Sequence, residues 1–158
     1  MTHAEPVIRI SRSVIAVLES LAPLADLGIR LWVAHFFWAS ALTKIFVDAA
    51  FPFVHVSPTT FMLFELEYQV PLLSPAVAAW LGTYVELVFP LLLAAGLGGR
   101  MAAAVLFVFN IVAVISYPTL QAAGQLQHAL YGTLLLLPLL RGPGKLSFDH
   151  LIRKHWMN

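Results

Sequence analysis

The side chain that most clearly invites a chemical role is Glu86, a single carboxylate in the middle of a long apolar run. The run extends from Ser74 to Arg100 and is long enough to cross a bilayer. Because lipid offers no water to solvate a carboxylate, Glu86 must face other protein, find a partner or take up a proton. An ionisable residue at that depth is therefore the first candidate for a functional site.

Other polar residues can be placed relative to Glu86 by counting about 1.5 Å per residue along each expected helix. His35 lies 11 residues before Phe46, Glu86 lies 11 after Pro75 and Asn110 lies seven before Tyr117, so all three fall near the middle of a bilayer. A second level nearer the external surface would hold the following residues, with Tyr131 approaching from that side: Thr43, Lys44, Trp80, Tyr117 and His128. Spacings of three and four residues place Trp80, Glu86, Asn110 and Tyr131 on inward faces.

Each of these residues also has a structural explanation. Glu86 and Asn110 could simply tie neighbouring helices together through hydrogen bonds. Lys44 could anchor its helix by extending toward the headgroups, and His35 could be a hydrogen-bonded core residue. Trp80 is typical of packing or of the aromatic belt of a membrane protein.

The composition of the chain indicates whether these side chains lie in a membrane or in a soluble domain. Hydrophobic residues make up 60% of the chain and charged residues 11%, against about 25% charged in soluble domains. We therefore expect an integral membrane protein. The net charge of +1 gives no indication of a nucleic-acid partner. The chain has no cysteine, which excludes a disulfide, a thiolate nucleophile and an iron–sulfur cluster.

The sequence contains no spacing of histidines that is typical of a metal or haem site. No two histidines stand four or five residues apart within the expected spans. His35 and His128 would differ in depth by more than about two helical turns, which argues against a haem held by both.

The apolar pattern predicts an all-α fold, a membrane four-helix bundle that forms one domain over residues 1–158. The expected spans are about 24–46, 75–97, 101–117 and 125–140. An amphipathic helix at about 7–21, ended by a break at Pro23, is expected to lie in the membrane interface. Residues 47–74 would form a long external loop with a short helix at 57–68. Asp26 and Arg30, four residues apart, would pair near the headgroups.

Charge placement supports four spans with both termini in the cytoplasm. In that topology one side of the membrane carries most of the cations: Arg9, Arg12, Arg100, Arg141, Lys145, Arg153 and Lys154. The other side keeps Lys44 as its one cation. This asymmetry follows the positive-inside rule, whereas three spans would place the cations from Arg141 to Lys154 outside.

Several motifs are more specific. The first span ends in WASALTKIF with Lys44, the second contains Glu86, the turn Gly96–Arg100 reads GLGGR, and the tail Gly142–Asp149 reads GPGKLSFD. In these pieces the chain resembles the DoxX family of small bacterial membrane proteins, over nearly all residues after Leu24. The resemblance implies a four-span inner-membrane bundle. It also implies a choice of roles: some members of the family are subunits of a quinone-linked sulfur oxidoreductase or of a redox-defence complex, and other members are associated with metal-related peptide pathways.

Two functional hypotheses follow. In the first, a quinone binds toward the external half, Glu86 and His35 relay its protons, and Lys44, His128 and Tyr131 polarise its oxygens. Tyr117, Asn110 and Trp80 would complete the binding site. Electrons would come from a partner protein, because the chain has neither cysteine nor a haem motif. In the second, the protein is a non-enzymatic accessory, anchor or small transport component. A homo-oligomer is compatible with both.

Overall fold

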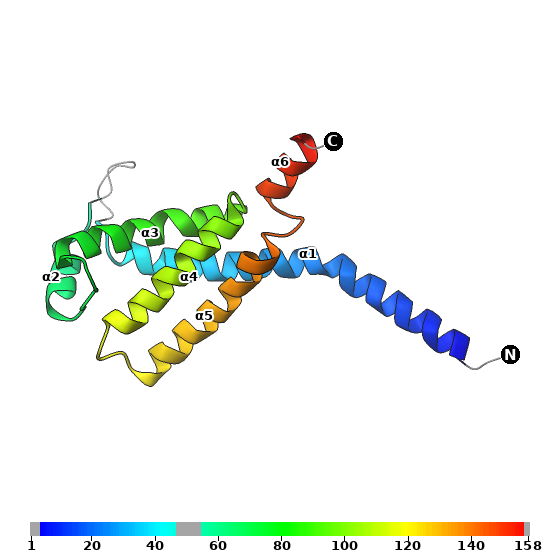
Figure 1. The fold of residues 1–158 in the computed structure, drawn as a ribbon, viewed down its shortest axis with the longest axis horizontal. Coiled ribbons are helices and arrows are strands. Elements are labelled where there is room, and N and C mark those ends of the chain that lie inside the picture. The colour runs from blue at the N-terminus through cyan, green and yellow to red at the C-terminus, as the bar shows by residue number, and fades with distance from the viewer. Residues whose placement is uncertain (1–3, 47–54, 157–158) are drawn as a thin grey trace.

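The computed structural model describes residues 4–46 and 55–156, and over these ranges it is entirely helical apart from turns and one isolated bridge. Six helices follow one another in this part of the chain (Figure 1): α1 Ala4–Leu42, α2 Pro58–Leu66, α3 Pro75–Ala95, α4 Gly99–Ser116, α5 Ala122–Arg141 and α6 Phe148–Trp156. The predicted all-α class is confirmed. The middle of the expected external loop, residues 47–54, lies outside the described residues.

The four long helices surround one apolar core. α1 packs against α3 and α5, and α4 packs against the same two helices, so each of the four contacts two others. The core consists of fully buried side chains, one or more from each of these helices: Val33, Phe37, Leu93, Leu106 and Leu135. Figure 1 shows α2 at one end of these helices and α6 near the other.

The N-terminal segment differs from the prediction. Instead of an interfacial helix that stops at Pro23, α1 runs without interruption for 39 residues and contains Pro23. Proline fixes φ near the helical value and removes one backbone donor, so a helix can continue through it at the cost of one hydrogen bond. The first half of α1 extends away from the other helices (Figure 1) and leaves Val14, Leu18 and Leu21 at least half exposed.

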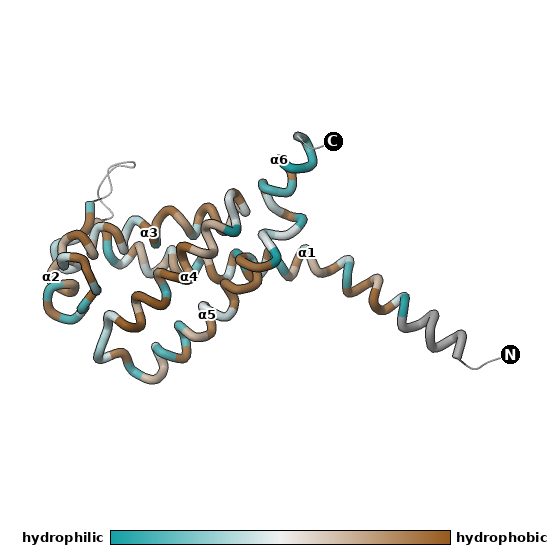
Figure 2. The backbone as a smooth tube through the Cα atoms, viewed as in Figure 1, coloured by the Kyte–Doolittle hydropathy of each residue, from teal (hydrophilic) through white to brown (hydrophobic). Residues whose placement is uncertain are grey.

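Two of the helices, α3 and α4, are long and apolar enough to cross a membrane. Figure 2 shows both as largely hydrophobic, whereas α6 is mostly hydrophilic. Ser74 precedes α3 and Pro75 occupies its first turn, as predicted. Gly96 then ends α3 with φ +68°, a left-handed conformation that glycine adopts without strain. The bounds of α3, α4 and α5 lie within a few residues of the expected spans, whereas α1 begins at Ala4, far before the expected start at residue 24.

A buried arginine and a tail carboxylate hold the α3–α4 turn. Arg30 is 1% exposed and donates hydrogen bonds to the carbonyls of Leu93 (3.3 Å), Ala94 (3.1 Å) and Leu146. These first two carbonyls lie at the C-terminus of α3, where the helix dipole favours a cation. The expected ion pair between Arg30 and Asp26 is not formed among the described residues, because Arg30 points into the protein.

Asp149 of α6 holds the other side of the same turn. Its two carboxylate oxygens accept hydrogen bonds from the backbone N–H groups of Gly98 (2.8 Å) and Gly99 (2.9 Å). A carboxylate at a helix N-terminus satisfies orphan donors and complements the dipole, so Asp149 caps α4 from a distant part of the chain.

Candidate functional site

Glu86 is buried in α3 and forms an ion pair with Lys44, which lies in the turn that follows α1. The two side chains are 5% and 13% exposed, respectively. Ser40, one helical turn before Lys44, joins both partners. Its hydroxyl donates to Glu86 Oε1 (3.1 Å) and accepts from Lys44 Nζ (3.1 Å). Carboxylate, ammonium and hydroxyl therefore form a closed network in which each group is satisfied by the other two.

The chain positions the two charges through different elements. Glu86 belongs to the buried face of α3, together with Thr83, Leu87 and Pro90. Lys44 is held by its own backbone, because its carbonyl accepts hydrogen bonds from Ser57 N (2.9 Å) and Thr60 Oγ1 (3.0 Å) at the start of α2. The start of the short helix α2 thus fixes the residue that neutralises Glu86.

A set of stacked aromatic rings lies near the end of the helices at which α2 packs. Tyr117 donates a hydrogen bond to the exposed carboxylate of Glu67 (2.9 Å) and stacks on Tyr68, which in turn stacks on Phe64. Burial, and then the negative charge of Glu86, raise the pKa of the Tyr68 hydroxyl above its ordinary value. The raised pKa keeps the Tyr68 hydroxyl protonated to a higher pH than that of a free tyrosine.

A second polar link joins α4 to α5. Asn110 Nδ2 donates to the backbone carbonyl of His128 (2.9 Å), and Asn110 Oδ1 faces His128 Nδ1 at 2.7 Å. Because an amide oxygen only accepts, Nδ1 must carry the proton of the imidazole. Phe36 of α1 packs its ring edge-to-face against His128 and stacks on Tyr131, with ring centroids 6.4 Å and 3.8 Å apart.

The candidate residues are therefore divided into two groups and three outliers. Glu86 and Lys44 come together, as do Asn110, His128 and Tyr131, and the charge of Lys44 lies within electrostatic range of His128. The expected hydrogen bond between Glu86 and another helix is present, with Ser40. Tyr117 joins neither group and bonds Glu67 instead.

His35 does not approach Glu86. The buried stripe of α1 passes through Val33, Ala34, Phe37 and Ala41, and His35 falls outside it. The imidazole is exposed and lines a shallow apolar hollow of about 180 Å³ on the outer side of α1 and α3. Among the described residues no hydrogen bond joins His35 to Glu86, so the structure offers no direct contact for the expected relay.

Trp80 also points away from the interior. Its side chain is 40% exposed, stacks on Tyr84 at 5.6 Å and meets Phe61 at 6.0 Å. The inward positions at this level are taken by Ala78 and Ala79, whose small side chains let α2 pack closely through Phe64. The expectation that Trp80 lines the bundle interior is wrong.

Two residues were missed at the level of sequence, Ser40 and Tyr68, and the burial of Arg30 was not predicted. Ser40 stands four residues before Lys44, a spacing that places the two on one helical face. Tyr68 follows two glutamates in an irregular segment and carries no periodic signal. Within residues 4–46 and 55–156, no group of three or more His, Cys, Asp or Glu side chains could hold a metal ion.

The DoxX family model matches residues 25–118, which is more than half of the chain. The chain belongs to the DoxX family. The match covers Arg30, Ser40, Lys44, Glu86 and Asn110, but it ends before α5 and the glycine-rich tail, so the resemblance is narrower than the sequence motifs suggest. No curated protein and no solved structure matches the chain. Family membership and the two apolar helices α3 and α4 together make this a membrane protein.

Proposed function

We propose that this DoxX-family protein is the membrane-embedded subunit of a redox system. In this proposal α1, α3, α4 and α5 form a four-helix bundle in the bacterial inner membrane, with both termini in the cytoplasm. The arrangement of cations supports this orientation. The start of α4, the end of α5 and α6, which carry Arg100, Arg141 and Arg153, lie at the end of the bundle opposite α2 (Figure 1). Lys44, near α2, would then be at the external half.

The observation that carries the proposal is the buried Lys44–Glu86 ion pair. A membrane protein that needed only apolar packing would gain little from two charges, since taking both out of water costs several kcal/mol per ion before they attract each other. A carboxylate and an ammonium that share a hydroxyl are suited to hold and pass on a proton. We therefore assign the proton-exchanging role to Lys44, Glu86 and Ser40, without His35.

A quinone-like carrier suits this set of donors. When bound, it would take up two electrons and two protons, and the electrons would come from a partner protein. The ammonium of Lys44 can donate to a carbonyl oxygen, and the carboxyl of Glu86 can supply or receive a proton. Tyr68, Tyr117 and Glu67 provide polar groups between Glu86 and the external surface, by which protons could be replaced.

A second candidate function is favoured by the completeness of the hydrogen bonding. Lys44, Glu86 and Ser40 satisfy one another, and so do Asn110 and His128. Such closed networks also occur where polar groups only fix how helices pack. The protein would then be a non-enzymatic membrane accessory or anchor, and its partners would be defined by surfaces other than this site.

One comparison separates the two functions. The wild-type protein, Glu86→Gln and the control Glu65→Gln, an exposed carboxylate of α2, are purified gently and extracted, and quinone is measured by mass spectrometry. The redox proposal expects near-stoichiometric quinone in the wild type and the control, and about tenfold less in Glu86→Gln if one interaction of about 1.4 kcal/mol is lost.

Two results would count against the redox role. One is a wild-type protein that carries no quinone after gentle purification. The other is a Glu86→Gln variant that melts at a lower temperature but retains as much quinone as the wild type. Either result would leave the accessory function as the explanation of the ion pair.

A further inference from the structure

A cavity of about 430 Å³ opens where the tail passes between α1 and the ends of α4 and α5. It is larger than the hollow beside His35, and Glu86 and Lys44 line neither of these two. Six charged side chains contribute to its walls: Glu19, Asp26, Arg100, Arg141, Lys145 and Arg153. This volume lies within the range of about 300–1,000 Å³ that is usual for small-ligand sites.

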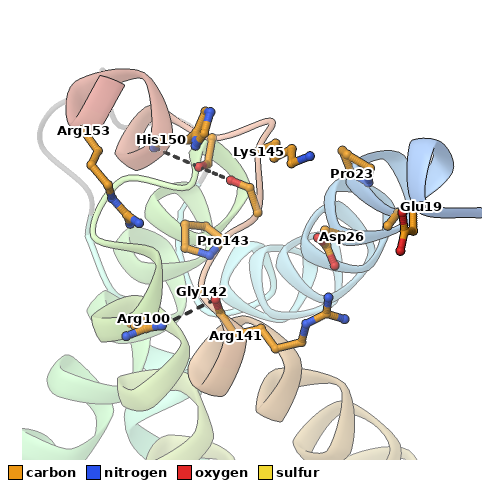
Figure 3. Close-up of a pocket in the computed structure, with 13 residues that line it drawn as sticks. Glu19, Pro23, Asp26, Arg100, Arg141, Gly142, Pro143, Lys145, His150 and Arg153 are labelled. Carbon is orange, nitrogen blue, oxygen red and sulfur yellow. Dashed lines mark hydrogen bonds between the residues drawn. The ribbon is translucent and has the colours of Figure 1, made fainter. Parts of the chain in front are cut away.

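The acidic and the basic side chains lie on different walls of the cavity. Both carboxylates, Glu19 and Asp26, come from α1, whereas the cations come from α4, the end of α5, the tail and α6 (Figure 3). No ion pair crosses the cavity, because the one ion pair among the described residues joins Lys44 and Glu86 at another place in the protein. Opposite charges that line one space without contact leave room for a molecule that carries both signs.

The floor of the cavity is a preformed turn. Gly142 and Gly144 have φ values of +92° and +80°, and a Cβ at Gly144 would lie 2.8 Å from Asp26 Oδ2. Glycine therefore lets the backbone approach the acidic wall closely. Buried Ser147 holds this turn, because its hydroxyl donates to the Gly144 carbonyl (2.6 Å) and accepts from His150 N (3.2 Å).

The surroundings of the cavity are apolar. Leu24 on α1 follows the lining residue Pro23 in the sequence, and Leu140 on α5 precedes the lining residue Arg141. The two leucine side chains are 58% and 71% exposed, respectively. In a membrane protein such side chains face acyl chains. A ligand of this cavity can therefore have a charged head between the walls and a hydrocarbon part along α1 and α5.

We propose that this cavity binds a phosphate ester that carries an ammonium group, presented by the membrane as an ethanolamine-type phospholipid headgroup. The guanidinium groups of Arg100, Arg141 and Arg153 match the geometry of phosphate oxygens, which they can bind through paired hydrogen bonds. The carboxylates of Asp26 and Glu19 receive the ammonium on the opposite wall. The site is independent of the redox role, since it lies at the other end of the helices from Lys44.

Lipid retention by the full-length protein tests the proposal. The protein is incubated in detergent with equal amounts of phosphatidylethanolamine and phosphatidylglycerol, and retained lipid is counted by native mass spectrometry. The zwitterionic lipid should be retained about tenfold more than the anionic one, as one additional charged interaction predicts. Soluble glycerophosphoethanolamine and inorganic phosphate, at the same concentration, should not displace it.

Variants of the two walls should have different effects. Arg141→Gln should reduce retention of both lipids, whereas Glu19→Gln should reduce the preference for phosphatidylethanolamine and leave phosphatidylglycerol unchanged. Glu19 is an exposed residue, so its loss should not affect folding, and Asp26→Asn gives a second test of the same wall. Lys154→Gln, a cation of α6 that does not line the cavity, is the matched control.

Three outcomes would overturn the proposal. Equal or stronger retention of phosphatidylglycerol would mean that the cations attract any anionic lipid. Displacement by glycerophosphoethanolamine would mean that the cavity takes a soluble phosphate ester. An unchanged lipid preference in both Glu19→Gln and Asp26→Asn would show that the acidic wall does not contact the ligand.

Discussion

Removal of one member of the Lys44–Glu86 pair should be the most destabilising single change of charge in the half of the protein that contains α2. In Glu86→Gln the Lys44 ammonium, 13% exposed, keeps Ser40 as its neighbour but loses its counter-ion. Breaking a buried ion pair from one side costs about 3–5 kcal/mol. Because the long side chain of Lys44 can extend toward the nearby surface, we expect the lower end, about 3 kcal/mol.

The double variant Lys44→Met/Glu86→Gln should recover most of this loss. With both charges removed, no unpaired ion remains, and replacement of a buried pair by neutral groups of similar size is often neutral. The two single changes should therefore not add, and their coupling energy should be about 2–3 kcal/mol, near the top of the range for residues in direct contact.

Thermal unfolding in detergent, followed by the fluorescence of the four tryptophans, measures these differences. For a chain of this size 1 kcal/mol corresponds to about 2–4 °C, so Glu86→Gln should melt roughly 6–12 °C below the wild type. The exposed control Glu65→Gln should remain within about 0.5 kcal/mol of the wild type. If the two single effects simply add in the double variant, Lys44 and Glu86 are not coupled, and the proposed proton-exchanging pair does not exist.

Three further changes test other parts of the structure. Asp149→Ala removes the cap from α4 and should cost about 0.5–2 kcal/mol in thermal unfolding, with Asp149→Asn less affected; equal stability of all three proteins would contradict the cap. Asn110→Leu removes both hydrogen bonds to His128 and should cost about 0.6–2 kcal/mol in the same assay, unlike the exposed control Thr133→Val. Since the folded protein raises the pKa of Tyr68, the unfolded chain loses this proton first, so stability should fall above about pH 10. Unfolding measured at about pH 9 and about pH 11 should show a smaller fall in Tyr68→Phe, and an identical fall would refute the assignment.

Local signals made several features of the fold predictable. Ser74 and Pro75 mark the start of α3 and Gly96 marks its end, because their backbone preferences act within one or two residues. The short helix after Ser57 follows from the same kind of signal, and Ser57 does accept a hydrogen bond from Thr60 N (3.2 Å). The interior position of Glu86 followed from its depth in an apolar run, since lipid cannot solvate a carboxylate.

The orientation of each helix was harder to predict, for a physical reason. A helix in a membrane is apolar toward lipid and toward its neighbours, so hydrophobic periodicity does not distinguish the two faces. His35 was placed by depth alone and Trp80 by depth and helical spacing, and both lie on outer surfaces. The sequence also did not predict that α1 continues through Pro23. Proline raises the free-energy cost of a helix at its position but does not exclude one.

The buried charges differ in what they contact, and this difference bears on function. Arg30 and Asp149 are directed at backbone groups, the carbonyls that end α3 and the N–H groups that begin α4. Backbone groups do not titrate, so such contacts hold the turn in place and cannot pass on a proton. Lys44 and Glu86 are directed at each other, and both can change protonation state. Within the described part of the chain, this is the one ion pair, so under the proposed function the stability of the helix packing and the movement of a proton would depend on the same two side chains.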